Sequence, residues 1–104
     1  MTGMNPPFCR KTAFNDLQTQ AGANWRMEED SLYAQWVFKD FAQAMAFMNA
    51  VADVAERMNH HPEWTNVYNR VNVRLTTHDA GGLTHLDFDL ARAMDTLAMT
   101  ASQS

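Results

Sequence analysis

The chain has 104 residues, of which 46% are hydrophobic, and eight basic against twelve acidic residues give a net charge of −4. This length fits one domain with its own core, and the lack of a Lys/Arg cluster disfavours direct binding of nucleic acid. No window approaches the roughly 18 apolar residues of a membrane-spanning helix, so we expect no membrane association.

The start of the chain predicts a flexible segment. Residues 1–9 contain Pro6 and Pro7 and no apolar run, which is unlike a signal peptide. Cys9 is the single cysteine, which excludes an intrachain disulfide and suits a reducing compartment. We therefore expect a cytoplasmic protein in which residues 10–101 form a single domain.

The first elements are a helix and a hairpin. Residues 10–21 predict a modest helix that ends near Gly22. Residues 25–27 and 32–38 predict two antiparallel strands, joined by the polar turn 28–31. The second strand has the period-two pattern of a half-buried strand. Its apolar face carries Leu32, Ala34, Trp36 and Phe38.

Residues 41–58 predict the longest helix, with Asp40 as its N-cap. Two neighbouring apolar stripes make its apolar face wider than one sheet usually needs, so we expect a contact with another helix or another subunit. Its methionines are interpreted as core packing rather than as a cofactor site. The stripes are Phe41, Met45, Met48, Ala52 and Ala55, and Ala44, Phe47, Val51, Val54 and Met58.

The second half of the chain is again predicted to form two strands followed by a helix. Residues 64–68 and 71–77 are rich in β-forming residues, and 69–70 are the predicted turn. Thr84 and Asp87 have the spacing of a capping box, which predicts the start of a final helix. The order α-β-β-α-β-β-α predicts an α+β fold: a four-stranded antiparallel sheet with three helices packed on one face.

Three of the four histidines converge in this fold. His60 and His61 lie at the junction of the long helix and the third strand, and His78 is predicted to end the fourth strand. Because the hairpin is antiparallel, the start of the third strand and the end of the fourth meet at one end of the sheet. Histidine can give and take a proton near neutrality, since its ordinary pKa is about 6.5.

Four interpretations of this cluster compete. Three surface histidines of no consequence remain an alternative. A metal site is disfavoured because adjacent residues of an extended segment point to opposite sides, and no Cys, HxH or HxxxH companion is present. A nucleophilic mechanism is disfavoured because Cys9 is remote. General acid–base chemistry is favoured, with Trp64 as a flat wall for a planar ligand and without metal or another cofactor.

A distinctive run, Glu-Arg-Met-Asn-His-His-Pro-Glu-Trp-Thr-Asn-Val-Tyr-Asn, occupies residues 56–69. Thr77-His78, Gly82-Leu83 and Asp87 follow it. With these motifs, and with Trp25 and Phe38-Lys39-Asp40-Phe41 upstream, the chain resembles the pterin-4a-carbinolamine dehydratase family from about residue 10 to residue 98. In animals this family doubles as the dimerisation cofactor of a homeodomain transcription factor.

The resemblance implies dehydration of 4a-hydroxytetrahydrobiopterin to quinonoid dihydrobiopterin. This reaction recycles the pterin cofactor of aromatic amino-acid hydroxylases, which are expected partners. The alternative is a non-catalytic dimerisation or adaptor module. The implied catalytic residues are His60, His61 and His78; the substrate-binding residues are these three with Asn59, Trp64, Thr76, Thr77 and Asp79. Asn59 stands where many relatives have an acidic residue.

We assign hypothetical roles within this set. His61 is the principal acid because Pro62 restrains its backbone, and His78 is the base on the pterin ring. His60 binds substrate or replaces His61 for the other 4a epimer. Glu56 and Asp87 are supporting residues, although helix capping explains Asp87 equally well. Glu63 is interpreted as a solvated carboxylate, and His85 as exposed rather than catalytic.

The sheet edges and the wide apolar face of the long helix predict self-association. The resemblance implies dimers through sheet edges that pair into tetramers through helices. We therefore expect a homo-oligomer, a dimer or a homotetramer, with helix 41–58 in a helix–helix interface. Replacing Phe47 or Val51 with Glu is expected to dissociate the assembly, or to unfold it if these side chains belong to the intrachain core.

Overall fold

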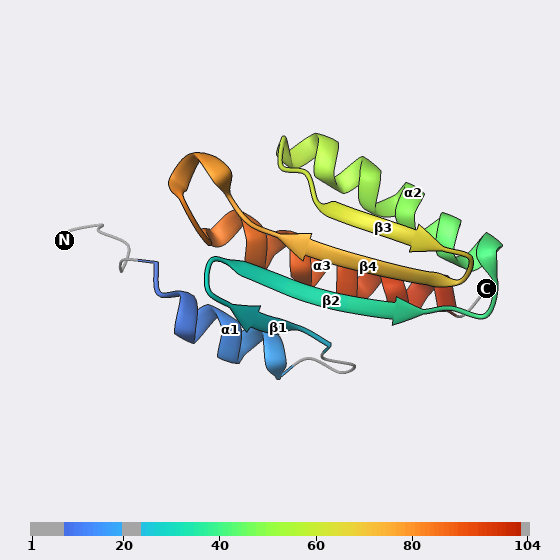
Figure 1. The fold of residues 1–104 in the computed structure, drawn as a ribbon, viewed down its shortest axis with the longest axis horizontal. Helices are drawn as coiled ribbons and strands as arrows, with labels where there is room; N and C mark the ends of the chain where they lie inside the picture. Colours follow the sequence, from blue (N-terminus) through green and yellow to red (C-terminus); the bar gives the residue numbers. More distant parts are fainter. Residues whose placement is uncertain (1–7, 20–23, 103–104) are drawn as a thin grey trace.

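The computed structural model describes residues 8–19 and 24–102, so the predicted flexible segment 1–9 lies mostly outside the described residues. Three helices cover one face of a four-stranded sheet (Figure 1), which confirms the predicted fold class and element order. The elements are α1 (Arg10–Gln18), β1 (Arg26–Glu28), β2 (Ser31–Val37), α2 (Phe41–Met58), β3 (Glu63–Val67), β4 (Arg70–Leu75), the short 3₁₀ helix η1 (His78–Ala80) and α3 (His85–Ser102).

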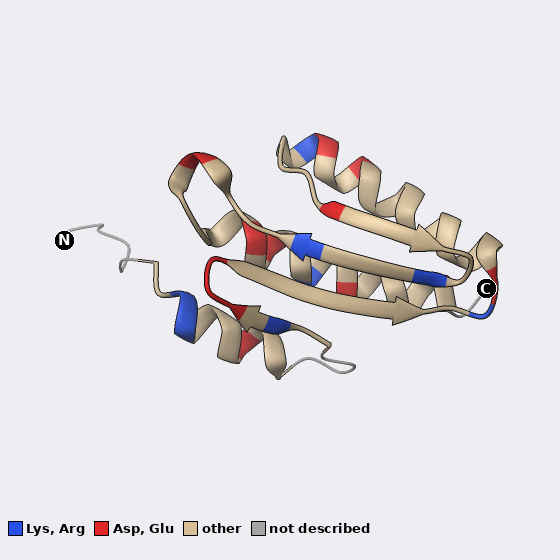
Figure 2. Cartoon of the chain, in the orientation of Figure 1, with Lys and Arg blue, Asp and Glu red and all other residues tan. Residues whose placement is uncertain are grey.

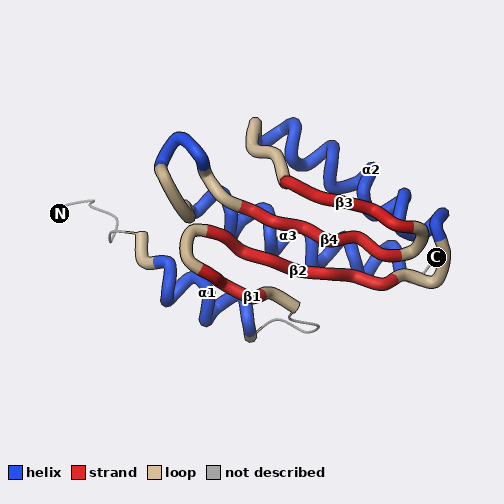
Figure 3. The backbone as a smooth tube through the Cα atoms, in the orientation of Figure 1, coloured by secondary structure: helices blue, strands red, loops and turns tan. Residues whose placement is uncertain are grey.

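The sheet has the order β1-β2-β4-β3, and every neighbouring pair is antiparallel (Figure 3). The central strands are therefore β2 and β4, while β1 and β3 form the edges. Helix α3 contacts both α1 and α2 and lies behind the middle of the sheet (Figure 1). None of the described helices has the length and apolar character needed to cross a membrane.

The core lies between the sheet and the helices, as the strand periodicity predicts. Leu32, Ala34 and Phe38 are buried on β2 and in the residue after it, while Trp36 is half-buried. On α2, Phe47 and Val51 are fully buried in this intrachain core. A Glu at either position would therefore disrupt the monomer's own core, so of the two expected outcomes, dissociation and unfolding, this burial favours unfolding. On the other apolar stripe of α2, which begins at Phe41, burial is incomplete: Phe41 and Ala52 are exposed.

Most predicted strand boundaries are wrong by one or two residues, and the end of the first helix by three. Helix α1 ends at Gln18, earlier than predicted, and the predicted stop at Gly22 lies outside the described residues. The turn of the first hairpin is narrower, residues 29–30. Strand β4 ends at Leu75, and the hydroxyl of the next residue, Thr76, donates to the backbone oxygen of Asp30 at 2.6 Å.

The second hairpin turns at Tyr68–Asn69 rather than at residues 69–70. Tyr68 adopts a left-handed conformation with φ 51°. The side-chain amide of Asn66 stabilises this turn by donating to the backbone oxygens of Tyr68 and Arg70, at 3.0 and 2.9 Å. Asn69 instead donates to the backbone oxygen of Phe38 at 2.9 Å. The cross-strand register therefore differs from the predicted one.

The segment after β4 forms a small closed loop. Thr77 and Gly82 exchange two backbone hydrogen bonds, each 3.2 Å long, and η1 lies between them. His78 therefore begins η1 and does not end β4 as predicted. Gly81 follows in the left-handed conformation, with φ 72°, where a glycine is unstrained. The loop still lies at the end of the sheet where β3 begins (Figure 1).

Candidate active site

The end of α2 separates the two adjacent histidines. Asn59 has φ 51° and ψ 42°, a left-handed C-terminal position that Asn tolerates. The backbone N–H groups of Asn59 and His60 donate to the oxygens of Glu56 and Ala55, at 3.2 and 3.0 Å. This helix end directs His60 into the protein, where it is 8% exposed, and leaves His61 exposed. Asn59 therefore has a structural role.

His60 is held by a fully buried carboxylate. Its Nε2 lies 2.6 Å from Oδ1 of Asp87, whose exposure is 0%. The other oxygen, Oδ2, accepts from the Thr77 hydroxyl at 2.8 Å and from the Thr84 backbone N–H at 3.0 Å. Asp87 thus accepts from the residue that precedes α3 and also contacts an imidazole, while its supporting role in catalysis stays a prediction.

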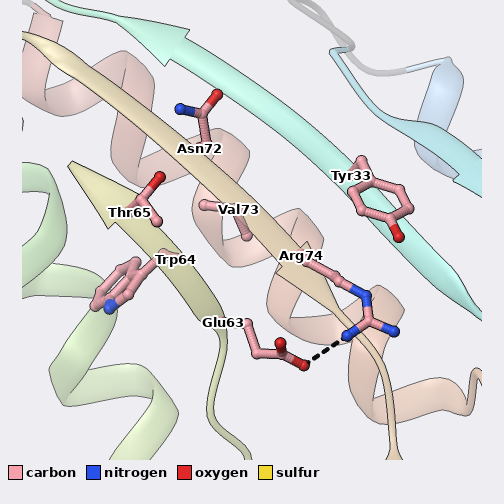
Figure 4. Close-up of a pocket in the computed structure, with 7 residues that line it drawn as sticks. All are labelled: Tyr33, Glu63, Trp64, Thr65, Asn72, Val73 and Arg74. Atoms are coloured by element: carbon pink, nitrogen blue, oxygen red, sulfur yellow. Dashed lines mark hydrogen bonds and ion pairs between the residues drawn. The ribbon is translucent and has the colours of Figure 1, made fainter. Parts of the chain in front are cut away.

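The other two histidines have exposed carboxylate partners. His61 Nε2 lies 2.6 Å from Oε2 of Glu56, and His78 Nε2 lies 3.2 Å from Oε2 of Glu63. Glu63 is exposed, as expected, but the same oxygen also accepts from Nη1 of Arg74 at 2.8 Å (Figure 4). Sequence reasoning missed this pair because the predicted turn implied another register.

The histidines line one cavity of about 270 Å³ at the end of the sheet. The structure brings together every predicted substrate-binding residue except Trp64. The lining residues are Asn59, His60, His61, Thr76, Thr77, His78 and Asp79. Trp64 is half-buried against the core and lines a separate groove of about 380 Å³, with Tyr33 and Arg74 (Figure 4). Its contribution to substrate binding stays a prediction.

Acidic residues occur at several places around this end of the sheet: in the β1–β2 turn, at the starts of β3 and α3, and near the end of α2 (Figure 2). Each imidazole directs Nε2 at one of these carboxylates. A carboxylate accepts a hydrogen bond, so the neutral tautomer carries its proton on Nε2 and a lone pair on Nδ1.

The three His–carboxylate pairs thus offer three Nδ1 atoms for proton transfer. Within residues 8–19 and 24–102, no hydrogen bond to another residue occupies these Nδ1 atoms. Over the same ranges, no three His, Cys, Asp or Glu side chains are grouped to hold a metal ion. The arrangement suits acid–base chemistry on a small ligand.

Comparison with known proteins identifies similar sequences. Residues 8–97 match the family model described as pterin 4 alpha carbinolamine dehydratase. The Drosophila melanogaster protein named pterin-4-alpha-carbinolamine dehydratase is 49% identical over 84 residues, covering 79% of this chain and 44% of that protein. A Synechococcus sp. (strain WH7803) relative, named as a candidate for the same enzyme, is 50% identical over 97 residues, covering 93% and 99%.

Two solved structures share the fold. The Brucella melitensis protein described as a transcriptional coactivator/pterin dehydratase superposes with a TM-score of 0.77 at 38% identity, covering 86% of this chain and 92% of that one. A pterin dehydratase-like protein described as a RuBisCO assembly factor in the alpha-carboxysome gives a TM-score of 0.63 at 26% identity, covering 74% and 92%. The segment matched by the family model contains all three His–carboxylate pairs.

Proposed function

This chain belongs to the pterin-4a-carbinolamine dehydratase family, and we propose that it dehydrates 4a-hydroxytetrahydrobiopterin to quinonoid dihydrobiopterin by histidine acid–base catalysis. One observation carries the proposal: His60, His61 and His78 line a single cavity, each with a carboxylate on its Nε2. No metal or organic cofactor is needed for the step.

The substrate has a hydroxyl on carbon 4a, next to the N5–H group. As the C4a–O bond breaks, the N5 electron pair forms the C4a=N5 bond. An acid donates a proton to the departing hydroxyl, which leaves as water, and a base accepts the proton from N5. One proton enters and one leaves, so no oxidant or reductant takes part. Each positioned acid or base contributes on the order of 10²–10⁴-fold.

The environments of the histidines suggest a division of roles. His61 and His78 are exposed at the cavity and can exchange protons with substrate and water, so we assign His61 as the acid and His78 as the base. His60 is buried and held by Asp87, which suits an orienting role or that of a substitute acid for the other 4a epimer. Asn59, Thr76, Thr77 and Asp79 would complete the binding site.

The decisive test is an assay with chemically generated 4a-hydroxytetrahydropterin. His61→Ala and His78→Ala should each lower kcat at least tenfold with little change in thermal stability, because both side chains are exposed. His85→Ala is the matched control: His85 is exposed but does not line the cavity, so its kcat should not change. Full activity in the first two variants would refute the proposal.

Chelation tests the competing metal hypothesis. We expect activity to survive prolonged treatment with a chelator, because a self-assisted leaving group needs no Lewis acid. Loss of activity that zinc restores would instead favour a metal-dependent hydrolytic mechanism.

The second candidate function is an adaptor module. The names of the two similar structures favour it, since they describe a coactivator and an assembly factor. A variant with all three cavity histidines replaced by Ala separates the two functions. If partner binding survives while dehydration is lost, the adaptor role stands beside catalysis; if the wild-type protein lacks dehydratase activity, the adaptor is the sole function.

We also propose a homo-oligomer, a dimer or a tetramer, that works in the cytoplasm beside an aromatic amino-acid hydroxylase. The exposed apolar side chains at the end of the sheet opposite the cavity support self-association: Val37, Phe41, Val67 and Tyr68 are 67%, 48%, 59% and 62% exposed. Phe41→Glu should dissociate the oligomer without unfolding the monomer. A stable wild-type monomer at micromolar concentration, by light scattering, would contradict this.

A further inference from the structure

We propose that Glu63, held in place by Arg74, is a positioning residue for His78: it keeps the imidazole proton on Nε2 and leaves the Nδ1 lone pair free to accept a proton from substrate. The proposal rests on the proposed function, in which His78 is the base, and adds two residues that the cavity lining does not contain.

The sheet register creates this contact. Glu63, the first residue of β3, lies directly opposite Arg74 on β4. Oε2 of Glu63 accepts from Arg74 Nη1 at 2.8 Å, the bond drawn in Figure 4, and it lies 3.2 Å from His78 Nε2. One carboxylate oxygen therefore joins the sheet to the 3₁₀ helix that carries His78.

Arg74 is itself anchored on its other side. Its Nε donates to the hydroxyl of Ser31 at 2.9 Å, and Ser31 is fully buried. The guanidinium also lies 3.7 Å from Oδ1 of Asp30. An arginine guanidinium remains a cation at every relevant pH. Glu63 is thus bound to a fixed, permanent charge.

Fold stabilisation alone does not explain this arrangement. The side chains of Glu63 and His78 are 52% and 76% exposed, and exposed ion pairs contribute about 0–1 kcal/mol. The contact has a larger effect on the imidazole. A neutral imidazole carries one N–H, and a carboxylate beside Nε2 favours the tautomer with its proton there.

The test uses Glu63→Gln, which preserves size but presents an amide that can donate or accept. We expect kcat to fall about tenfold with KM changed less than twofold, because the base is misoriented rather than removed. Arg74→Ala should lower kcat in the same direction. The double variant should be no worse than Glu63→Gln alone, because both residues act through one contact.

Glu28→Gln is the matched control. Glu28 forms an exposed ion pair with Arg26 on strand β1, with a side-chain exposure of 53%, and it does not line the cavity. Its loss should leave kcat within twofold of the wild type. Any drop shared by Glu28→Gln and Glu63→Gln would show a general effect of removing a surface carboxylate and would overturn the proposal.

A second readout needs no substrate. Long-range ¹H–¹⁵N spectra of histidine-labelled protein identify the tautomer at a pH about two units above the ordinary histidine pKa of about 6.5. The His78 signal, assigned with His78→Ala, should show Nε2–H in the wild type and more Nδ1–H in Glu63→Gln. An unchanged tautomer overturns the proposal. A wild-type protein without dehydratase activity but with this tautomer shift would refute the proposed function and leave the control of His78 by Glu63 intact.

Discussion

Asp87 and Asp95 are two buried carboxylates on one helix, α3, about two turns apart. Their exposures are 0% and 5%. Both oxygens of Asp87 have partners on three other residues. Asp95 has one partner: its Oδ1 accepts from the indole N–H of Trp25 at 2.9 Å. Its Oδ2 is buried without a hydrogen-bond partner among the residues that the structure describes.

The difference shows that partners, and not burial, decide what a carboxylate does here. A buried carboxylate loses its hydration, and hydrogen bonds must offset that cost. At Asp87 the offset comes from the candidate active site itself, which links α3, the loop after β4 and the end of α2. At Asp95, burial raises the pKa to about 6, and the Trp25 hydrogen bond opposes this only in part. Asp87 therefore stabilises the fold through the same contacts that hold His60 in the site. The charged form of Asp95 instead destabilises the fold.

The largest effect is expected for Asp87→Ala. It leaves His60 buried without its partner and removes the acceptor of the Thr77 hydroxyl and the Thr84 N–H. We expect the free energy of unfolding in urea to fall by about 3–5 kcal/mol, with loss of activity. Asp87→Asn keeps the volume and one acceptor oxygen, so it should lose less stability and still lower kcat. A loss below about 1 kcal/mol in Asp87→Ala would show that the network does not stabilise the fold.

Much of this comparison follows from sequence, but not all of it. Periodicity and the capping-box spacing place Asp87 at the start of α3, and antiparallel topology brings His78 to His60. The contact between Glu63 and Arg74 was missed because a turn at residues 69–70 would pair Glu63 with Thr76. The observed turn lies one position earlier, at Tyr68–Asn69, which shifts the register by two residues and places Arg74 opposite Glu63.

The state of Asp95 has no local signal at all. Its partner, Trp25, lies 70 positions away in sequence. An aspartate in the middle of an amphipathic helix is usually exposed, so its burial against the aromatic side of the core depends on how α3 packs. Sequence patterns predict which elements form and which ends meet; they do not predict which buried oxygen lacks a donor.

Asp95→Asn should stabilise the protein, and only in one pH range. The folded-state pKa of about 6 exceeds the ordinary value of 3.8, so the folded state binds the proton more tightly. That contribution is complete below pH about 4 and is lost as the pH rises through about 6. At pH 7 the variant should therefore unfold with a free energy about 1–3 kcal/mol higher than the wild type. Urea titrations of the wild type and the variant at pH 7 and at pH about 4 test this. An equal difference in their free energies of unfolding at the two pH values would contradict it.

The smallest loss of stability is expected for Asp40→Ala, which removes a helix cap alone. Comparing it with Asp87→Ala separates the capping contribution of Asp87 from that of its other contacts. Asp40 is the N-cap of α2, and its Oδ1 accepts from the backbone N–H of Gln43 at 2.9 Å. Loss of this capping bond in Asp40→Ala should lower the free energy of unfolding by only about 1 kcal/mol. Because Asp40 lies at the opposite end of α2 from His60, kcat should not change. Asp40→Ser, which retains a capping oxygen, should restore most of that loss. If Asp40→Ala cost as much free energy of unfolding as Asp87→Ala, capping alone would account for Asp87, and its bonds to His60 and Thr77 would contribute nothing measurable.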